Sequence, residues 1–215
     1  MRLVLVGPPG SGKGTQAELI VGRLGLRSIG TGDILRDAIR LKTPTGLLVE
    51  PLMKQGLLVP DSVVNDVVAE LFRLPDRPES FVTDGYPRTY AQAIAFDALL
   101  NQQYLKLDAV IDLASEDEEV VRRISGRRCC TNKACGALYH MAVKPPRVPG
   151  VCDRCGSPLL TRDDDREETI RQRLKEFHKN TDALIDHYRN RGLLREVSAL
   201  DPPETIYANI LRQIQ

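Results

Sequence analysis

The stretch Gly7-Pro8-Pro9-Gly10-Ser11-Gly12-Lys13-Gly14-Thr15 decides the fold class of this 215-residue chain. The apolar run Leu3-Val4-Leu5-Val6 precedes it, and a helical pattern that begins with Gln16-Ala17-Glu18 follows it. A glycine-rich loop between a strand and a helix lets backbone N–H groups converge on phosphate oxygens, while the helix N-terminus and a lysine add positive charge. The sequence therefore predicts a P-loop that binds the phosphates of a nucleoside triphosphate.

One position of this loop differs from the commonest P-loop pattern. Ser or Thr usually follows the lysine directly, whereas here Gly14 does, and the hydroxyl comes one residue later at Thr15. Either Thr15 or Ser11 can reach a magnesium ion that accompanies the triphosphate. A tight turn that binds no ligand is the alternative, and the strand and helix on either side argue against it.

Composition excludes several classes of protein. The chain has 30 Lys and Arg against 29 Asp and Glu, which argues against a broad nucleic-acid-binding face. No apolar stretch approaches the roughly 20 residues that span a bilayer, and the N-terminus enters a strand instead of a signal peptide. We therefore expect a cytoplasmic protein that binds neither nucleic acid nor membrane.

Apolar runs that suit buried parallel strands alternate with amphipathic helical stretches, which is typical of a doubly wound α/β sheet. The predicted strands are Arg2–Val6, Leu26–Ile29, Ser80–Thr83, Ala109–Leu113 and Leu193–Val197. The predicted helices are Lys13–Leu24, Gly32–Leu41, Ser62–Phe72, Tyr90–Asn101, Asp117–Ile124, Glu167–Arg191 and Pro203–Gln213. We expect a P-loop fold with a five-stranded parallel sheet.

The segment Gly126–Arg162 interrupts this pattern and contains every cysteine of the chain. Two pairs, Cys130-x4-Cys135 and Cys152-x2-Cys155, suit a structural zinc site with four thiolate ligands. Cys129 is left over and can replace Cys130 as a ligand. Reduced cysteines that pack as small core residues are the alternative, which the paired spacing disfavours. The segment reads as an inserted module too small to have a core of its own, which zinc would stabilise.

Two polar segments directly follow predicted strands, at the strand ends where parallel sheets bind ligands. Thr31-Gly32-Asp33-Ile34-Leu35-Arg36 places a hydroxyl and a guanidinium at the start of a helix, where Arg36 can hold a second phosphate. Asp84-Gly85-Tyr86-Pro87-Arg88 combines a carboxylate, which can orient a magnesium-bound water, with a planar arginine fork for phosphate oxygens. A capped helix start and a polar turn are the respective alternatives.

Motifs spread over nearly the whole chain resemble those of adenylate kinases, specifically the bacterial long form with a zinc-bearing lid. They are Gly7–Thr15 with Gln16, Thr31–Arg36, Gly56–Asp61, Asp84–Arg88 with Gln92, Gly126-Arg127-Arg128, and Arg162–Asp165 followed by Arg173. The later hydroxyl at Thr15 is normal in this family. The resemblance implies reversible transfer of the terminal phosphoryl group of magnesium-bound ATP to AMP, giving two ADP for adenine nucleotide homeostasis, by a monomer.

The resemblance also implies roles for individual residues. It assigns ATP to Gly10, Ser11, Gly12, Lys13, Gly14, Thr15, Arg127, Leu138 and Tyr139. It assigns AMP to Thr31, Arg36, Leu57, Leu58, Val59, Gly85, Tyr86, Pro87, Arg88, Gln92, Arg162 and Arg173. Gln92 and the Val59 backbone read the adenine. The catalytic set is Lys13, Asp84, Arg88, Arg123, Arg127, Arg162 and Arg173, and the zinc ligands are Cys130, Cys135, Cys152 and Cys155.

The resemblance further divides the chain into a core of residues 1–30, 60–125 and 163–215, an AMP-binding segment 31–59 and a zinc-binding lid 126–162. We expect both smaller parts to close over substrate and exclude water. The chain departs from the family pattern at Gly30, where serine is usual, and in the longer first cysteine spacing. No clear counterpart of the C-terminal adenine contact is present beyond Ala199–Pro202, so no site is assigned there.

Two other functions remain open from the sequence. A kinase for another nucleoside monophosphate would share the phosphate-binding residues, and only Thr31 and Gln92 favour adenine. A zinc-ribbon nucleic-acid-binding module that uses its P-loop as a switch is the alternative from another class. The near-zero net charge and the absence of tryptophan disfavour that module.

Overall fold

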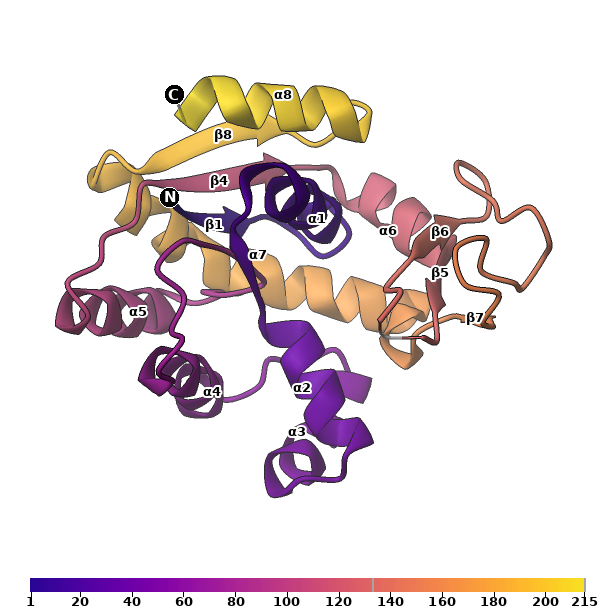
Figure 1. The fold of residues 1–215 in the computed structure, drawn as a ribbon, viewed down its shortest axis with the longest axis horizontal. Helices are drawn as coiled ribbons and strands as arrows, with labels where there is room; N and C mark the ends of the chain where they lie inside the picture. The colour runs from indigo at the N-terminus through magenta and orange to yellow at the C-terminus, as the bar shows by residue number, and fades with distance from the viewer. Residues whose placement is uncertain (133, 215) are drawn as a thin grey trace.

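The computed structural model describes residues 1–132 and 134–214 (Figure 1). Lys133, in the predicted inserted module, and Gln215, at the end of the predicted core, lie outside the described residues. The centre is a five-stranded parallel sheet with the strand order β2-β3-β1-β4-β8. Its strands are β1 (Arg2–Val6), β2 (Arg27–Gly30), β3 (Phe81–Asp84), β4 (Ala109–Ala114) and β8 (Leu194–Ser198). The predicted fold and strands are confirmed, with each strand end within one residue.

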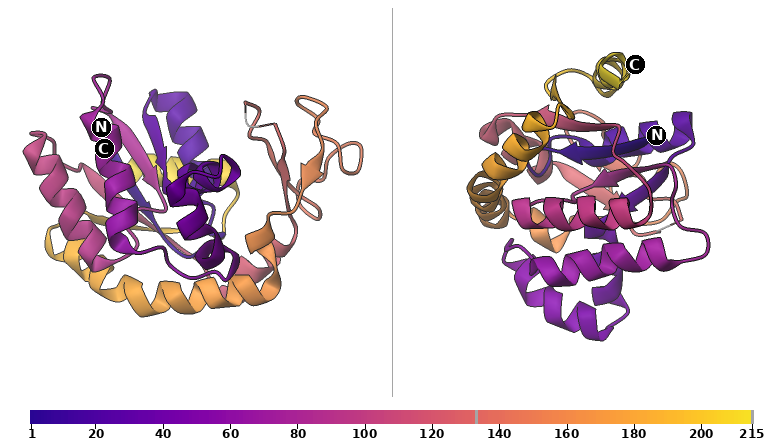
Figure 2. Two further views of the ribbon diagram at one scale, coloured as in Figure 1. Left: turned by 90° about the horizontal axis from the view of Figure 1, so that it is seen from below. Right: turned by 90° about the vertical axis from the view of Figure 1, so that its left-hand side faces the viewer.

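Helices cover both faces of the sheet (Figures 1 and 2). On one face, Leu3 and Leu5 of β1 pack in the same apolar cluster as residues of α1 (Lys13–Leu24) and α8 (Pro203–Ile214). On the other face, Val4 and Val6 share a cluster with residues of several more helices. These include α4 (Asp61–Arg73), α5 (Tyr90–Gln102) and α7 (Glu167–Asn190). Burial on both faces explains why the strands read as continuous apolar runs.

The strand register places the polar segments at one edge of the sheet. Leu5 of β1 and Gly30 of β2 both pair with Asp84 of β3, and Val6 pairs with Asp112 of β4. The P-loop follows β1, and Thr31 follows β2. Since all these strands are parallel, their carboxyl ends and the segments that follow them meet in one place.

The cysteine-containing segment forms a separate antiparallel sheet, to the right of the central sheet in Figure 1. Its strands are β5 (Arg127–Cys130), β6 (Leu138–His140) and β7 (Leu159–Leu160), in the order β6-β5-β7. Helix α6 (Asp117–Ser125) leads into it, and a 3-10 turn, η1 (Asp163–Asp165), leads from it into α7. The long α7 then runs from the base of this segment beneath the core, as Figure 2 shows. No helix among the described residues is long and apolar enough to cross a bilayer.

Helix α3 (Pro44–Lys54), which packs against α2 (Thr31–Arg40), is missing from the predicted helices. Pro51 inside it reads as a helix breaker in the sequence. The helix begins normally, with Pro44 in its first turn and Thr43 as N-cap, whose side chain accepts a hydrogen bond from the Gly46 N–H at 3.1 Å. Packing against α2 thus outweighs the local signal of Pro51.

Gly46 makes the approach of α3 to α2 possible. A Cβ atom at this position would lie 2.0 Å from the Ala38 carbonyl oxygen, a backbone atom that cannot move aside alone. Alanine normally stabilises a helix relative to glycine by up to about 1 kcal/mol. Here the clash reverses the sign.

We expect Gly46→Ala to lower the free energy of unfolding by about 1–3 kcal/mol, the usual cost of overpacking. Urea denaturation measures this. Gly22→Ala in α1 is the matched control, because a Cβ at Gly22 meets nothing within 4 Å, and it should be neutral or stabilising. A stabilising effect of Gly46→Ala would contradict the close approach of the two helices.

Candidate active site

The P-loop joins β1 to α1 in a conformation that depends on glycine. Gly10 has φ 77°, and Gly12, the N-cap of α1, has φ 99°. A Cβ atom at Gly10 would lie 2.6 Å from Ile124 Cγ1 of α6. The loop is thus packed against the helix that leads into the cysteine segment, and its free N–H groups stand at the start of α1.

Lys13 lies half-buried in this loop. Its Nζ donates hydrogen bonds to the carbonyl oxygens of Gly7 at 2.8 Å and Pro8 at 2.7 Å. Burial is the main reason why the pKa of Lys13 falls from 10.5 to about 8. The carboxylate of Asp84 opposes this change, whereas the positive charges of Arg88 and Arg173 add to it. The ammonium is therefore less stable here than in water, and a phosphate would stabilise it.

Asp84 explains the glycine that follows the lysine. A Cβ atom at Gly14 would stand 3.3 Å from Asp84 Oδ2, so this carboxylate lies directly beside the first turn of α1. The neighbouring strand adds Asp112. Burial and the charge of Glu196 raise the pKa of this carboxyl, and Lys13 offsets only part of the rise. Asp112 was not among the predicted site residues. Its position at the carboxyl end of a predicted strand was the available signal.

A cleft of about 560 Å³, including its open mouth, lies at the carboxyl ends of β2 and β3. Nine residues predicted to bind AMP line it: Thr31, Arg36, Leu57, Leu58, Val59, Gly85, Arg88, Gln92 and Arg173. Leu35, Met53 and Val64 add apolar surface. We call this cleft the acceptor pocket. A pocket that joins apolar walls to arginines suits a ligand with a flat base and a phosphate.

Three other residues predicted to bind AMP, Tyr86, Pro87 and Arg162, are not among those that line the pocket. Tyr86 is buried and packs edge-on against Phe96, with ring centroids 5.1 Å apart. Its hydroxyl donates to Asn65 Oδ1 at 2.8 Å. The structure thus places this ring in the core behind the pocket. Arg162 lies 3.9 Å from Asp33 of α2.

Backbone and side chain meet closely at Gly85. Its carbonyl oxygen accepts hydrogen bonds from Thr31 Oγ1 at 2.9 Å and from Arg88 Nε at 2.8 Å. Gly85 has φ 77°, and a Cβ there would lie 2.8 Å from the Arg88 guanidinium. A larger residue at position 85 would displace Arg88 from the pocket.

The remaining arginines are held by carboxylates. Arg173 pairs with Asp164 at 2.9 Å, and Arg36 lies 4.0 Å from the same carboxylate. Arg127 of β5 makes a two-point contact with Asp165, whose side chain is fully buried. Asp164 and Asp165 were not among the predicted site residues, although the acidic run that follows Arg162 in the sequence indicated that they lie near it.

Arg123 also pairs with a carboxylate, but this partner belongs to its own helix: Arg123 Nε donates to Glu119 of α6 at 2.6 Å.

Positive charge is in excess around the acceptor pocket. Burial lowers the pKa of Arg173 to about 10, and the charges of Arg88 and Arg127 act in the same direction. Burial also lowers the pKa of Arg88. Burial also disfavours the ionised form of Asp164, but the positive charges of Arg173 and Arg36 outweigh burial and lower the pKa of that carboxyl. The free site is therefore suited to bind anions.

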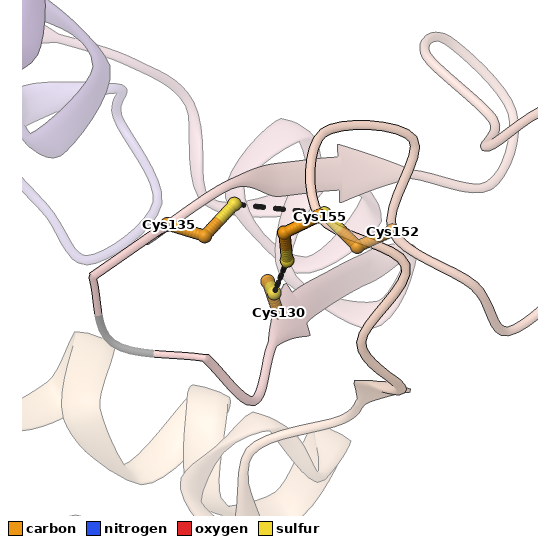
Figure 3. Close-up of side chains that lie close together, drawn as sticks. All are labelled: Cys130, Cys135, Cys152 and Cys155. Carbon is orange, nitrogen blue, oxygen red and sulfur yellow. Dashed lines mark hydrogen bonds between the residues drawn. The ribbon is translucent and has the colours of Figure 1, made fainter.

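Four cysteine side chains point toward one another in the inserted segment (Figure 3). The sulfur atoms of Cys130, Cys135, Cys152 and Cys155 all lie within 4.8 Å of one another. The Cys130–Cys155 and Cys135–Cys152 sulfur distances are 3.4 and 3.6 Å. These are too long for disulfides and close to the roughly 3.8 Å between thiolates placed tetrahedrally around zinc. The donor set therefore fits zinc.

Cys129 lies outside this cluster, although it is adjacent to Cys130. Successive side chains of a strand point to opposite faces, and both residues belong to β5. At Cys152, burial disfavours the thiolate, but hydrogen bonds from the Tyr139 hydroxyl and from backbone N–H groups outweigh it and lower the pKa to about 6. A thiolate at neutral pH is the form that binds a metal.

Two of the residues predicted to bind ATP, Leu138 and Tyr139, lie on β6. Tyr139 is buried, its hydroxyl lies 3.6 Å from Cys152 Sγ, and it accepts a hydrogen bond from the Asp153 N–H at 2.7 Å. Tyr139 therefore supports the cysteine cluster, and its contact with ATP stays a prediction, as does that of Leu138.

Comparison with known proteins gives a consistent result. The family described as Adenylate kinase matches residues 5–193. The adenylate kinase of Streptomyces avermitilis is 47% identical over 206 residues, which cover 96% of this chain and 93% of that protein. The enzyme of Archaeoglobus fulgidus is 45% identical over 210 residues, covering 98% and 96%, and that of Moorella thermoacetica is 47% identical over 211 residues, covering 98% and 95%. Since the match includes both the P-loop and the acceptor pocket, the chain belongs to the adenylate kinase family.

Proposed function

We propose that the P-loop binds ATP and that the acceptor pocket binds AMP, so that the terminal phosphoryl group passes directly between them. The reaction of the family, reversible conversion of ATP and AMP into two ADP, makes the chain a phosphotransferase. The observation that carries the placement is geometric: a Cβ at Gly14 of the P-loop would stand 3.3 Å from Asp84 Oδ2, and the next residue, Gly85, lines the acceptor pocket. The two phosphate-binding regions are therefore contiguous.

The residues act by alignment and charge stabilisation, since phosphoryl transfer requires little covalent work from the protein. The bond from the terminal phosphorus to the bridging oxygen of ATP breaks, and a bond to an AMP phosphate oxygen forms. Lys13 and the P-loop N–H groups hold the donor, and Arg36 and Arg88 hold the acceptor phosphate. Arg123, Arg127, Arg162 and Arg173 complete the positive surround. Thr31, Gln92 and the backbone around Val59 position the base.

Magnesium enters with ATP and supplies charge neutralisation of its phosphates. Oxygen ligands suit this ion, and the structure offers the Asp84 carboxylate beside Gly14 and the hydroxyl of Thr15 in the same turn. Asp84 would orient the water shell of the ion. The buried Ser11 hydroxyl, which has no hydrogen-bond partner among the described residues, is a further oxygen at this loop.

Water competes with AMP as acceptor, so closure of the site is part of the mechanism. Segment 126–162 acts as a lid over ATP and carries Arg127 and Arg162. Segment 31–59 closes over AMP, and residues 1–30, 60–125 and 163–215 form the core. Gly126, where the lid begins, packs closely against the lid strand β6, because a Cβ there would lie 2.3 Å from His140 Nε2. The protein acts as a cytoplasmic monomer.

An assay with magnesium and ATP that offers AMP, CMP, UMP and GMP separately tests the function. We expect rapid ADP formation with AMP and at least about 100-fold lower kcat/KM with the other three, because unmatched buried polar groups are costly. Preference for another monophosphate would keep the mechanism and overturn the base assignment. No transfer to any of them would refute the function.

The lowered pKa of Lys13 predicts a pH-dependent affinity for ATP. Below pH 8 the ammonium is present before and after binding, so affinity is constant with respect to this group. Above pH 8 the free protein has lost the proton, and binding must take it up, because phosphate raises the pKa of Lys13. The Kd for ATP should therefore rise with pH, by up to about tenfold per unit.

Isothermal titration calorimetry between pH 7 and 9.5 at constant ionic strength measures this dependence. AMP binding is the internal control, because the acceptor pocket relies on arginines and should show little change up to pH 9. An ATP affinity that is flat over the whole range would contradict the assignment of Lys13.

The cysteine cluster binds a structural zinc ion held by Cys130, Cys135, Cys152 and Cys155. The support is the convergence of their sulfur atoms, with Cys129 outside. Four thiolates fill a tetrahedral site, so the ion offers no open position for substrate. Its role is to stabilise the lid, whose apolar cluster consists of only a few residues, Ala137, Tyr139, Cys152 and Leu159.

Zinc analysis of cysteine variants separates the ligands from the spare thiol. Wild type and Cys129→Ser should both retain about one zinc per chain, whereas Cys130→Ser should lose the metal on dialysis against a chelator. Removal of the metal should also lower the thermal midpoint. Loss of zinc from Cys129→Ser with retention in Cys130→Ser would reverse the ligand assignment.

A further inference from the structure

Gln92 is a buried residue at the wall of the acceptor pocket, and both ends of its amide have partners. Its Oε1 accepts a hydrogen bond from the backbone N–H of Arg88 at 2.8 Å, and its Nε2 donates to Asp61 Oδ1 at 2.7 Å. A backbone N–H can only donate, and an ionised carboxylate can only accept. The two contacts therefore define which end of the amide is oxygen and which is nitrogen.

Asp61 is itself held in place. It is the first residue of α4, and its Oδ2 accepts a hydrogen bond from the Thr89 hydroxyl at 2.8 Å. Thr89 is the N-cap of α5 and accepts from the backbone N–H of Gln92 at 3.1 Å. The Thr89 hydroxyl, fixed at the start of α5, thus holds the carboxylate against the end of the Gln92 side chain.

A glutamine amide with no such partners can turn by 180° and exchange its donor for its acceptor. If Gln92 turned, its NH₂ group would face the Arg88 N–H, and its oxygen would face the Asp61 carboxylate. The first contact would oppose two donors and the second two acceptors. Both would be repulsive, and the buried groups would lose their hydrogen bonds.

The orientation of this amide matters because purine bases differ in their hydrogen-bonding groups. Adenine has an acceptor at N1 and a donor amino group on C6, whereas hypoxanthine and guanine have a donor at N1 and an acceptor oxygen on C6. An amide fixed in one orientation matches one pattern, and the turned amide matches the other. A site that opposes like groups discriminates strongly between such bases.

We propose that Asp61 is a positioning residue that makes the acceptor pocket specific for adenine, because it fixes the orientation of the Gln92 amide. Gln92 lines the pocket, whereas Asp61 is not among the lining residues. Asp61 acts on the base through Gln92. This inference rests on the proposed function, in which the pocket receives the acceptor monophosphate.

Variants at position 61 test the proposal with AMP and inosine monophosphate as alternative acceptors. Asp61→Ala and Asp61→Ser both remove the carboxylate, and serine is well tolerated at helix starts, which provides a folded variant if alanine does not. Asp61→Asn keeps an oxygen that accepts from Gln92 Nε2. Asp66→Ala is the matched control, because it removes an exposed carboxylate from the same helix. The thermal midpoint of each variant verifies folding.

The measured quantity is the ratio of kcat/KM for AMP to that for inosine monophosphate at saturating magnesium-bound ATP. We expect both deletion variants to lower this ratio at least about tenfold, the scale of one buried hydrogen bond. The KM for ATP should not change. Asp61→Asn and Asp66→Ala should keep the wild-type ratio.

Three outcomes would overturn the proposal. An equal loss of kcat/KM for both acceptors in the deletion variants would show that Asp61 supports only the shape of the pocket. A wild-type protein that does not prefer AMP to inosine monophosphate would leave nothing for Asp61 to determine. An unchanged ratio in both deletion variants would show that the Gln92 amide keeps its orientation without the Asp61 carboxylate. Failure of the wild type to phosphorylate any monophosphate would refute the proposed function instead.

Discussion

The site must hold several partly exposed cations close together before any phosphate arrives, and much of the structure serves this constraint. Burial and mutual repulsion lower the pKa values of Lys13 and Arg173. Asp84, at the end of β3, and Asp164, in the turn before α7, offset part of this charge. Since both carboxylates lie at the ends of well-packed elements, the cations keep their positions without a ligand, and little reorganisation is needed when phosphate binds.

Features that depend on local sequence were predictable. The central strands are buried on both faces, so they appear as apolar runs, and their ends follow from the polar segments after them. The glycines of the P-loop are required by its backbone conformation, and the strand before it and helix after it gave the phosphate-binding function. The four clustered cysteines followed from their spacing. What the spacing left open was the choice between Cys129 and Cys130, which the alternation of side chains along β5 resolves geometrically.

Features that depend on contacts between distant residues were not predictable. Helix α3 contains a proline and is stabilised by its approach to α2 at Gly46, a contact that no local pattern reveals. The pairing of Arg127 with Asp165 joins residues far apart in the chain, and so does that of Gln92 with Asp61. The contact of Tyr139 with Cys152 was not predictable for the same reason, because it forms only when β6 and the second cysteine pair are folded together.

The turn Asp163–Asp165 carries acidic side chains that contact arginines of both α2 and β5. Asp164 lies beside Arg36 of α2, and the next carboxylate, Asp165, holds Arg127 of β5. A phosphate that attracts Arg36 competes with Asp33, at 2.7 Å, and with the more distant Asp164, whereas one that attracts Arg127 competes with Asp165. Because the two acids are adjacent at the start of α7, one short turn lies against an arginine of α2 and an arginine of β5. This turn is therefore the place where electrostatic contacts with both elements meet.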